Sequence, residues 1–417
     1  MKCVLMVAFH FPPLAGSSGI QRTLRFAQHL PKFDWQPLVL SASPRAYERV
    51  SSDMNADILP GTVVRRAFAL DTARHLSVSG RYVGAMARPD RWISWRFDGV
   101  RQGLQMIRKY KPAVIWSTYP IATAHLIGAE LHRRTGIPWV ADFRDPMAQE
   151  GYPADPLTWE QFRQIEQMAM TQATRCVFTT PGAAAYYRQL HPEAAARIEV
   201  IENGYDEETF TGLLGSGTIG TPQPLVPGSL TLLHSGIVYP SERDPTQLMV
   251  ALRQLHDAGT IRPGSLTVRF RAAVAEDLLR QLAKQHGVEP YVEVCPPITY
   301  RDALSEMMRA DGLLIMQASN CNAQIPAKLY EYLRTGCPVL CLTDPVGDTA
   351  NVLRQAGIDA IAPLDDAAEI ASLLARFLQP METAGLRMLP TDGFVASASR
   401  MQRTQSLGKL LDQVAAL

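Results

Sequence analysis

The sequence lacks the features that would place it across a membrane or in an oxidising compartment. No apolar run approaches the roughly 20 residues that cross a bilayer. The apolar run at residues 3–8 is too short, and no small-residue cleavage site follows it. The 6 cysteines form no C-x-x-C pair and show no spacing typical of metal ligands. We therefore expect a reduced, cytoplasmic protein that is free or lies on the inner face of the membrane.

A strong excess of one charge is also missing from the chain as a whole. Its 41 Lys and Arg residues nearly balance its 40 Asp and Glu residues, which argues against a nucleic-acid-binding protein. One segment departs from this balance, because residues 65–111 hold eleven Lys or Arg residues and three Asp residues. This basic segment also carries aromatic residues, a combination that suits contact with an anionic membrane. An arginine-lined acceptor groove and a plain solvated surface are the alternatives.

The length of the chain, 417 residues, suits two globular domains of about 200 residues each. The clearest boundary is residues 213–228, which are rich in Gly, Pro, Ser and Thr. We expect domains at residues 1–212 and 229–393, with this segment as the linker and a helix in residues 394–417. Residues 41–100 show no regular pattern.

The N-terminal segment reads as a strand at residues 3–8, a loop with two glycines, Gly16 and Gly19, and an amphipathic helix at residues 20–30. This order directs backbone N–H groups and a helix N-terminus at an anion. The loop is not G-x-G-x-x-G, so it does not indicate a dinucleotide site. A connecting turn without a ligand is the alternative.

Charged residues follow the strand expected at residues 138–141, in the motif DFRDP. Functional groups of parallel sheets gather beyond the carboxyl ends of strands, where Asp142, Arg144 and Asp145 fall. Buried charges must be paired or used. These three residues are therefore either site residues or a structural Arg–carboxylate cluster.

The second half restarts with a strand at residues 230–234, followed by a loop with Gly236 and Arg243. A strand, a glycine turn and a basic residue at the start of a helix suit a phosphate. The alternative for Arg243 is an ion pair with its neighbour Glu242 or Asp244.

The segment of residues 322–342, NAQIPAKLYEYLRTGCPVLCL, combines a helix, a turn at Gly336 and a buried strand. Lys328 and Glu331 lie three residues apart on the helix and therefore share a face. One cation and one carboxylate on one face can hold a phosphate and a ribose. An exposed ion pair of little energetic consequence is the alternative.

Several of these motifs together resemble the GT-B glycosyltransferases of the large, retaining family-four group. The resemblance rests on IPAKLYEYLRTGCPVL, on the FPP loop and QRTLRFAQHLP helix, and on ENGYDEETF at the end of the first half. DFRDP is typical of a subgroup. The resemblance implies an α/β fold of two Rossmann-like domains with parallel sheets that face each other across a cleft. It also implies a C-terminal helix that crosses back to the first domain.

The resemblance assigns donor-binding roles to particular residues. Glu331 matches the glutamate that binds the ribose of the nucleotide sugar, while the family's earlier glutamate is replaced by Ala323 with Gln324 beside it. In the first phosphate loop of the second domain, Ile237 stands where the family has arginine. The remaining donor-binding residues expected by resemblance are Gly16, Gly19, Gly236, Arg243 and Lys328.

The resemblance also directs the choice of catalytic candidates. The family's histidine is missing beside DFRDP, so Asp142 or Asp145 becomes the candidate for acceptor binding or general base, with Arg144 between them. Arg243 and Lys328 would neutralise the departing diphosphate. No metal and no cofactor beyond the nucleotide sugar is expected, and retention of configuration is the family expectation.

The predicted function is transfer of a sugar from a nucleotide diphosphate sugar to a sugar, lipid-linked or small-molecule acceptor in glycoconjugate or polysaccharide biosynthesis. A GT-B sugar-nucleotide epimerase and a nonenzymatic nucleotide-sugar-binding protein are the alternatives. The sequence leaves open the nucleotide, the sugar, the acceptor, the base and the oligomeric state.

Overall fold

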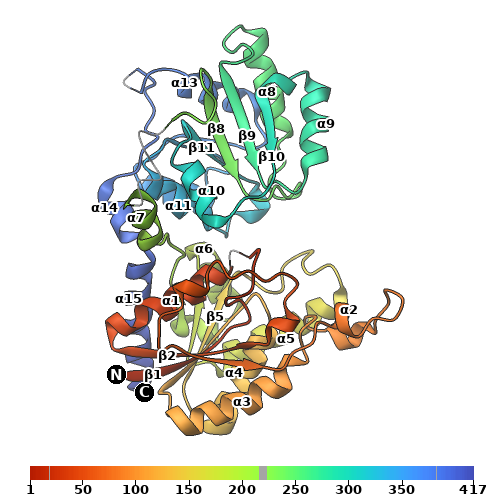
Figure 1. Ribbon diagram of the computed structural model, residues 1–417, viewed down its shortest axis with the longest axis vertical. Helices are drawn as coiled ribbons and strands as arrows, with labels where there is room; N and C mark the ends of the chain where they lie inside the picture. The colour runs from red at the N-terminus through yellow and green to blue at the C-terminus, as the bar shows by residue number, and fades with distance from the viewer. Residues whose placement is uncertain (18, 216–222, 382) are drawn as a thin grey trace. The chain divides into compact units, whose positions relative to one another are not determined.

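The computed structural model describes the chain except residues 18, 216–222 and 382 (Figure 1). The chain divides into two compact units. The first unit is Met1–Asn203 with Arg400–Leu417, and the second unit is Gly204–Ser399. Each unit is built on a parallel sheet, which confirms the predicted α/β class with two Rossmann-like domains.

The first unit contains a seven-stranded sheet in the order β3-β2-β1-β4-β5-β6-β7. All of its strand pairs are parallel. The chain builds outward from β1 on one side and from β4 on the other, so the strand order reverses between them, and a crevice is expected at their carboxyl ends. The strands are β1 (Lys2–Val7), β2 (Trp35–Ala42), β3 (Val63–Ala67), β4 (Val114–Thr118), β5 (Trp139–Arg144), β6 (Arg175–Phe178) and β7 (Ile198–Val200).

Strand β3 and the short helix α2 (Thr72–His75) lie inside residues 41–100, for which the sequence shows no pattern. Strand β3 is an edge strand of sequence VVRRA, and its arginines hide the apolar signal of a buried strand. The other helices that flank this sheet are α1 (Gly19–His29), α3 (Trp95–Tyr110), α4 (Thr123–Thr135), α5 (Pro156–Gln172) and α6 (Pro181–Leu190).

The C-terminal helix α15 (Arg400–Ala415) belongs to the first unit and packs against α1. A Cβ atom at Gly408 would lie 3.2 Å from the Cβ of Phe33, so the small residue permits this close approach. The helix begins at Arg400, and the residues before it form α14 (Asp392–Ser397) in the second unit.

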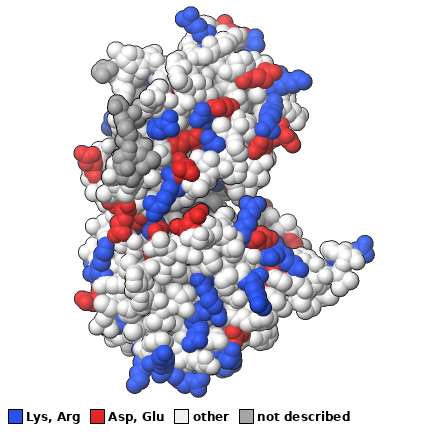
Figure 2. Space-filling model, in the orientation of Figure 1, with Lys and Arg blue, Asp and Glu red and all other residues white. Residues whose placement is uncertain are grey.

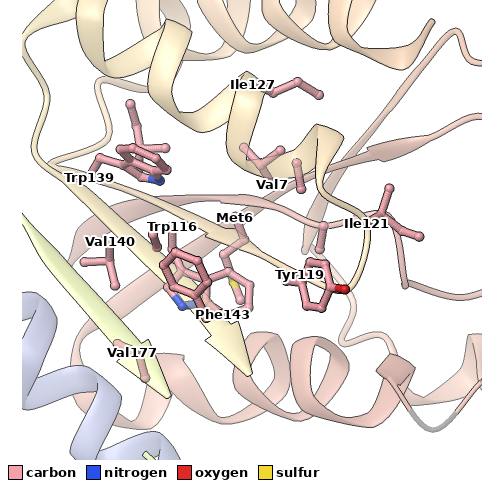
Figure 3. Close-up of a cluster of buried hydrophobic side chains, with 14 of the residues drawn as sticks. Met6, Val7, Trp116, Tyr119, Ile121, Ile127, Trp139, Val140, Phe143 and Val177 are labelled. Atoms are coloured by element: carbon pink, nitrogen blue, oxygen red, sulfur yellow. The ribbon is translucent and has the colours of Figure 1, made fainter. Parts of the chain in front are cut away.

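The core of the first unit lies between its sheet and the covering helices (Figure 3). Within this core, the indole N–H of Trp139 donates to Ser117 Oγ at 2.8 Å. A Cβ atom at Gly99 would lie 2.6 Å from Ile127 Cδ1, so glycine lets α3 approach α4. Other buried members of this cluster are Met6, Val7, Trp116, Tyr119, Ile121, Val140, Phe143 and Val177.

The second unit contains a six-stranded parallel sheet in the order β10-β9-β8-β11-β12-β13. Its strand order reverses between β8 and β11, where a second crevice is expected. The strands are β8 (Leu230–Ser235), β9 (Leu266–Arg271), β10 (Val292–Cys295), β11 (Gly312–Gln317), β12 (Val339–Thr343) and β13 (Ile361–Ala362).

The helices of the second unit follow the strands in the alternating order of a doubly wound fold. The predicted linker, residues 213–228, overlaps the end of α7, and its residues 216–222 lie outside the described part of the chain. None of the described helices in either unit is long and apolar enough to cross a membrane. The helices here are α7 (Glu207–Gly215), α8 (Thr246–Asp257), α9 (Glu276–His286), α10 (Tyr300–Met307), α11 (Lys328–Thr335), α12 (Asp348–Gln355) and α13 (Ala367–Phe377), with α14 described above.

Candidate functional site

Lys328 and His234 meet at the carboxyl edge of the second sheet. Lys328 is the first residue of α11, and its Nζ lies 3.1 Å from Nε2 of His234 on β8. The other ring nitrogen, Nδ1, lies 2.9 Å from the carbonyl oxygen of Leu314. Because a carbonyl only accepts, Nδ1 carries the proton and Nε2 is free to accept from Lys328. No local sequence pattern indicated His234.

The electrostatics of this pair favour an anion. Burial is the main cause that lowers the pKa of Lys328 well below its ordinary value, and the positive charge of Arg243 lowers it further. Burial and the charge of Lys328 also lower the pKa of His234 well below its ordinary value. The imidazole is therefore neutral at physiological pH, and a bound anion would stabilise the ammonium of Lys328.

Gly236 leaves room beside this pair. Its φ of +119° is a conformation that L side chains rarely adopt. A Cβ atom at this position would lie 3.2 Å from Nζ of Lys328. The structure therefore brings together two of the predicted donor-binding residues, and the absence of a side chain on one keeps the amine of the other accessible.

Arg243 is held in the loop that follows β8. One terminal N–H donates to the carbonyl oxygen of Ile237 at 2.7 Å, and the guanidinium lies 5.2 Å from the ring centre of Tyr239. Its ion pair with Glu242 is long, 3.9 Å, while Asp244 accepts from Thr246 instead. Among the described residues, nothing accepts from Nε of Arg243. The ion pair considered as an alternative therefore occupies only part of this side chain.

Glu331 lies one turn after Lys328 on α11. Its Oε1 accepts a hydrogen bond of 2.7 Å from the hydroxyl of Tyr300, the first residue of α10. The hydroxyl of Thr299 accepts from the N–H of Asp302 and caps α10, which fixes the start of that helix. Tyr300 orients the carboxylate that the sequence predicts to bind ribose, although the sequence did not indicate the tyrosine.

Gln324 lies in the loop before α11. Its carbonyl oxygen accepts from Gln317 Nε2 and from Thr349 Oγ1, both at 3.1 Å. These bonds tie the backbone of the loop to β11 and α12, while the side chain of Gln324 remains partly exposed. The backbone of Gln324 therefore has a structural role, and the predicted contact with the donor depends on its side chain alone.

Asp142, at the carboxyl edge of the first sheet, is fully buried and fully engaged. Arg22 of α1 grips it with two hydrogen bonds, Nε to Oδ2 at 3.0 Å and a terminal nitrogen to Oδ1 at 2.7 Å. Thr118 Oγ1 adds a third at 2.7 Å. A bidentate, buried pair of this kind holds α1 against β5. The arrangement of Asp142 therefore fits the structural Arg–carboxylate cluster considered as the alternative. Its partner, Arg22, was not indicated by the sequence.

Arg144 ends β5 at an irregularity in the pairing with β6. Its φ of +64° is unusual for a residue other than glycine and turns the side chain toward α1. A terminal nitrogen donates to the carbonyl oxygens of Gly19 and Tyr119, at 3.2 and 3.4 Å. Its Nε has no partner within the described ranges. Burial lowers the pKa of this guanidinium, and the nearby carboxylate of Asp145, which is exposed, opposes that change.

His10 completes this edge, and sequence reasoning missed it as well. Its Nδ1 lies 3.2 Å from Oγ of Ser17, which also accepts from the N–H of Gly19 at 3.2 Å. A Cβ atom at Gly19 would lie 2.3 Å from Nδ1 of His10 and 3.0 Å from a nitrogen of Arg144. Only glycine fits there. Burial and the charge of Arg144 lower the pKa of His10 to about 3, so its imidazole is neutral.

The other loop glycine, Gly16, has a φ of +78°, and the nearest atom to the place of a Cβ atom is Cδ of Arg49 at 3.7 Å.

Within the described ranges, no three His, Cys, Asp or Glu side chains are arranged to hold a metal ion. The polar groups at the two edges are thus arginines, a lysine, neutral histidines and single carboxylates.

Solved structures with the same fold extend over the whole chain. HepE from Anabaena, in complex with UDP and glucose, has a TM-score of 0.67 at 14% identity and covers 99% of this chain and 100% of its own. Sucrose-phosphate synthase from Thermosynechococcus elongatus has a TM-score of 0.67 at 14% identity, with 100% of both chains covered. The UDP-forming alpha,alpha-trehalose-phosphate synthase from Burkholderia vietnamiensis has a TM-score of 0.68 at 11% identity, with 100% of both chains covered. The fold is therefore GT-B.

The family comparison concerns the first half of the chain. Residues 18–204 match the glycosyl transferase 4-like domain. The chain therefore has the GT-B fold, and its first half carries a glycosyl transferase 4-like domain. No curated protein sequence matches the chain. The matched range includes Arg22, Asp142 and Arg144. Lys328 and Glu331 lie outside it, so their proposed roles depend on the geometry described above.

Proposed function

We propose that the protein is a glycosyltransferase, which takes its sugar from a nucleotide diphosphate sugar that binds at the carboxyl edge of the second sheet. One observation carries the proposal: the amine of Lys328, whose pKa is lowered by burial and by the charge of Arg243, lies beside a neutral His234 and the glycine Gly236. The negative charge of a diphosphate would offset the repulsion between Arg243 and the charged form of Lys328. HepE was obtained in complexes with UDP and glucose and with UDP-glucose, which supports testing uridine donors first.

Transfer of the sugar requires the bond to the diphosphate to break while negative charge grows on the departing oxygen. In this proposal the ammonium of Lys328 and the guanidinium of Arg243 stabilise that charge, which is electrostatic catalysis by groups already in place. His234 accepts a hydrogen bond from Lys328 and aims the amine without adding a charge of its own. Glu331, oriented by Tyr300, binds the ribose hydroxyls.

The acceptor would bind at the carboxyl edge of the first sheet. Asp142 has its oxygens engaged by Arg22 and Thr118, so in this proposal it positions α1. Asp145 is the exposed carboxylate of the group and remains the candidate for the acceptor's proton. Arg144, with an unpartnered Nε among the described residues, is the candidate for an anionic group of either substrate. Gly16, Gly19 and Gln324 remain proposed donor-binding residues.

We further propose that the reaction needs neither a metal ion nor a cofactor and retains the anomeric configuration. The two cations of the second unit would do the work that a divalent metal does elsewhere. The proposed setting is the cytoplasmic side of a membrane, with a sugar, a lipid-linked sugar or a small molecule as acceptor.

The proposal is tested with a panel of nucleotide sugars in the presence of EDTA. A ligand that binds only the folded protein raises its melting temperature by mass action. We expect one nucleotide class to do so in the wild type and in Lys284→Met, which changes an exposed lysine of the same unit. Lys328→Met should lose the shift. Equal shifts in Lys328→Met and Lys284→Met would contradict the proposed donor site.

Activity separates transfer from the alternatives. A transferase releases free nucleotide only when an acceptor is present, whereas an epimerase changes the sugar without releasing nucleotide. Binding without either reaction would indicate a nucleotide-sugar-binding protein.

A further inference from the structure

The basic segment, residues 65–111, is less uniform than its composition suggests. Several of its arginines tie the first unit together: Arg66 and Arg74 donate to Tyr47, Arg88 pairs with Asp155 at 2.9 Å, and Arg91 pairs with the buried Asp71. These guanidinium groups are already used. A surface that meets a partner must be sought among the remaining residues.

Residues 76–86, which we call the arm, form such a surface between α2 and α3. All residues from Val78 to Met86 are exposed. The arm holds five large apolar side chains that are at least 38% exposed, among them Val78 at 79% and Val83 at 63%. Figure 2 shows a projecting segment that is almost entirely white with a blue tip, in the position of the loop beyond α2 in Figure 1. Single exposed apolar residues are common, but a cluster on one projection marks a contact surface.

The arm is a formed structure. Val78 and Arg81 exchange backbone hydrogen bonds of 2.8 and 3.0 Å around a two-residue turn. Both turn residues, Ser79 and Gly80, have positive φ, as a type I′ hairpin requires. At the base, Thr72 Oγ1 donates to the carbonyl oxygen of Met86 at 2.7 Å. These hydrogen bonds define the backbone of the arm at its turn and at its base.

The charges around the arm select its partner. Residues 72–97 contain five arginines and a single carboxylate, Asp90. That carboxylate is engaged by Thr123 and by the N–H of Trp92. Among the described residues, Arg81 at the turn has no ion-pair partner. The arm thus combines apolar side chains with a free cation and offers no available anion.

The arm also emerges at a functional edge. It follows β3, so it leaves the first sheet on the side where the carboxyl ends of all its parallel strands lie. The same edge carries His10, Gly19 and Arg144.

We propose that the arm seats the protein on an anionic lipid surface, with Val78, Tyr82, Val83 and Met86 entering the interface and Arg81 meeting lipid phosphates. This inference narrows the membrane contact proposed above from the whole basic segment to its one projecting hairpin. Vesicle binding needs no sugar donor, so it fails or succeeds separately from the proposed donor site.

The test is flotation of the full chain with vesicles of phosphatidylcholine alone or with phosphatidylglycerol. We expect binding to the anionic vesicles, weakened by salt because the electrostatic part is screened. Val83→Glu with Met86→Glu should reduce the bound fraction about tenfold, since it replaces apolar contact by repelled charge. Leu190→Glu with Val346→Glu adds the same charge at two exposed apolar residues outside the arm and should bind as the wild type does.

Circular dichroism and the nucleotide-induced thermal shift show that each variant is folded and keeps its donor site. No vesicle binding by the wild type, or equal binding by both double variants, would overturn the proposal. So would a wild type that is dimeric in sedimentation velocity and becomes monomeric in the arm variant, because the arm would then cover a second copy of the chain.

Discussion

Two charged sites lie at the carboxyl edges of the two sheets, and they are built in opposite ways. In the first unit, the carboxylate of Asp142 meets the guanidinium of Arg22 in a bidentate pair and accepts a third hydrogen bond from the hydroxyl of Thr118. In the second unit, Lys328 meets a second cation, Arg243, and a neutral imidazole, and burial lowers its pKa. The charges of the first site are paired within the protein, whereas the second is the site that we propose for an anion.

The difference indicates which charges hold the fold and which await a ligand. A fully buried carboxylate with both oxygens hydrogen-bonded is suited to a structural role. A lysine whose pKa is lowered by burial and by a neighbouring cation is a candidate for function. Each prediction below tests one side of this contrast.

The largest expected effect is on stability in the first unit. Arg22→Met leaves Asp142 buried without its partner, which we expect to lower the free energy of unfolding by about 3–5 kcal/mol. Urea denaturation measures it. The exposed pair of Lys2 and Asp412 serves as the control, because Lys2→Met should cost only about 0–1 kcal/mol. Similar losses in the two variants would contradict the structural role of Asp142.

Lys328→Met should show the reverse pattern in the second unit. Donor affinity should fall about 10- to 100-fold, since a charged hydrogen bond is worth roughly 1.5–3 kcal/mol. The unfolding free energy without ligand should not fall, because the substitution removes a charge that burial disfavours. Calorimetric titration and urea denaturation together give both numbers. A destabilised protein with unchanged affinity would make Lys328 a structural residue.

The pH dependence of stability tests the neutral histidine of the first unit. The pKa of His10 is about 3 in the folded protein and near 6.5 when unfolded, so the unfolded chain binds the proton more readily. Its contribution is therefore complete above pH 6.5 and is lost as the pH falls toward 3. Between pH 7 and pH 5 the loss should be about 2 kcal/mol.

His10→Gln should remove that share of the pH dependence, measured as the difference in unfolding free energy between the two pH values. An unchanged slope would show that other groups control acid stability. The buried His125, with a pKa of about 4, contributes in the same direction and remains in the variant.

The smallest expected effect concerns Tyr300. Tyr300→Phe removes the hydrogen bond to Glu331, so stability should fall by at most about 0.5–1.5 kcal/mol, and the less well oriented carboxylate should weaken donor binding a few-fold. Calorimetric titration against the nucleotide alone measures it. Glu331→Gln, which keeps the shape but removes the charge, should weaken binding more, and a larger effect of the tyrosine would reverse their proposed roles.

Local sequence patterns predicted much of this protein. Alternation of apolar strands with amphipathic helices indicated two parallel α/β units, because fully buried strands read as continuous apolar runs. The segment with Lys328, Glu331 and Gly336 predicted a helix that carries both charges on one face and ends at the glycine. The edge strand β3 was not predicted, because its arginines and partial exposure remove the continuous apolar run of a buried strand.

The tertiary structure alone decided which of these residues are partners. Arg22 and Asp142 are 120 residues apart, and Lys328 and His234 are 94 apart, so no local pattern links them. The hydrogen bond of Tyr300 to Glu331 and the crowding of Gly19 against His10 likewise arise when strands and helices pack. Sequence periodicity determined the elements, because it records which face is buried. Whether a buried charge is satisfied or waits for a ligand depends on partners that only packing brings within hydrogen-bonding distance.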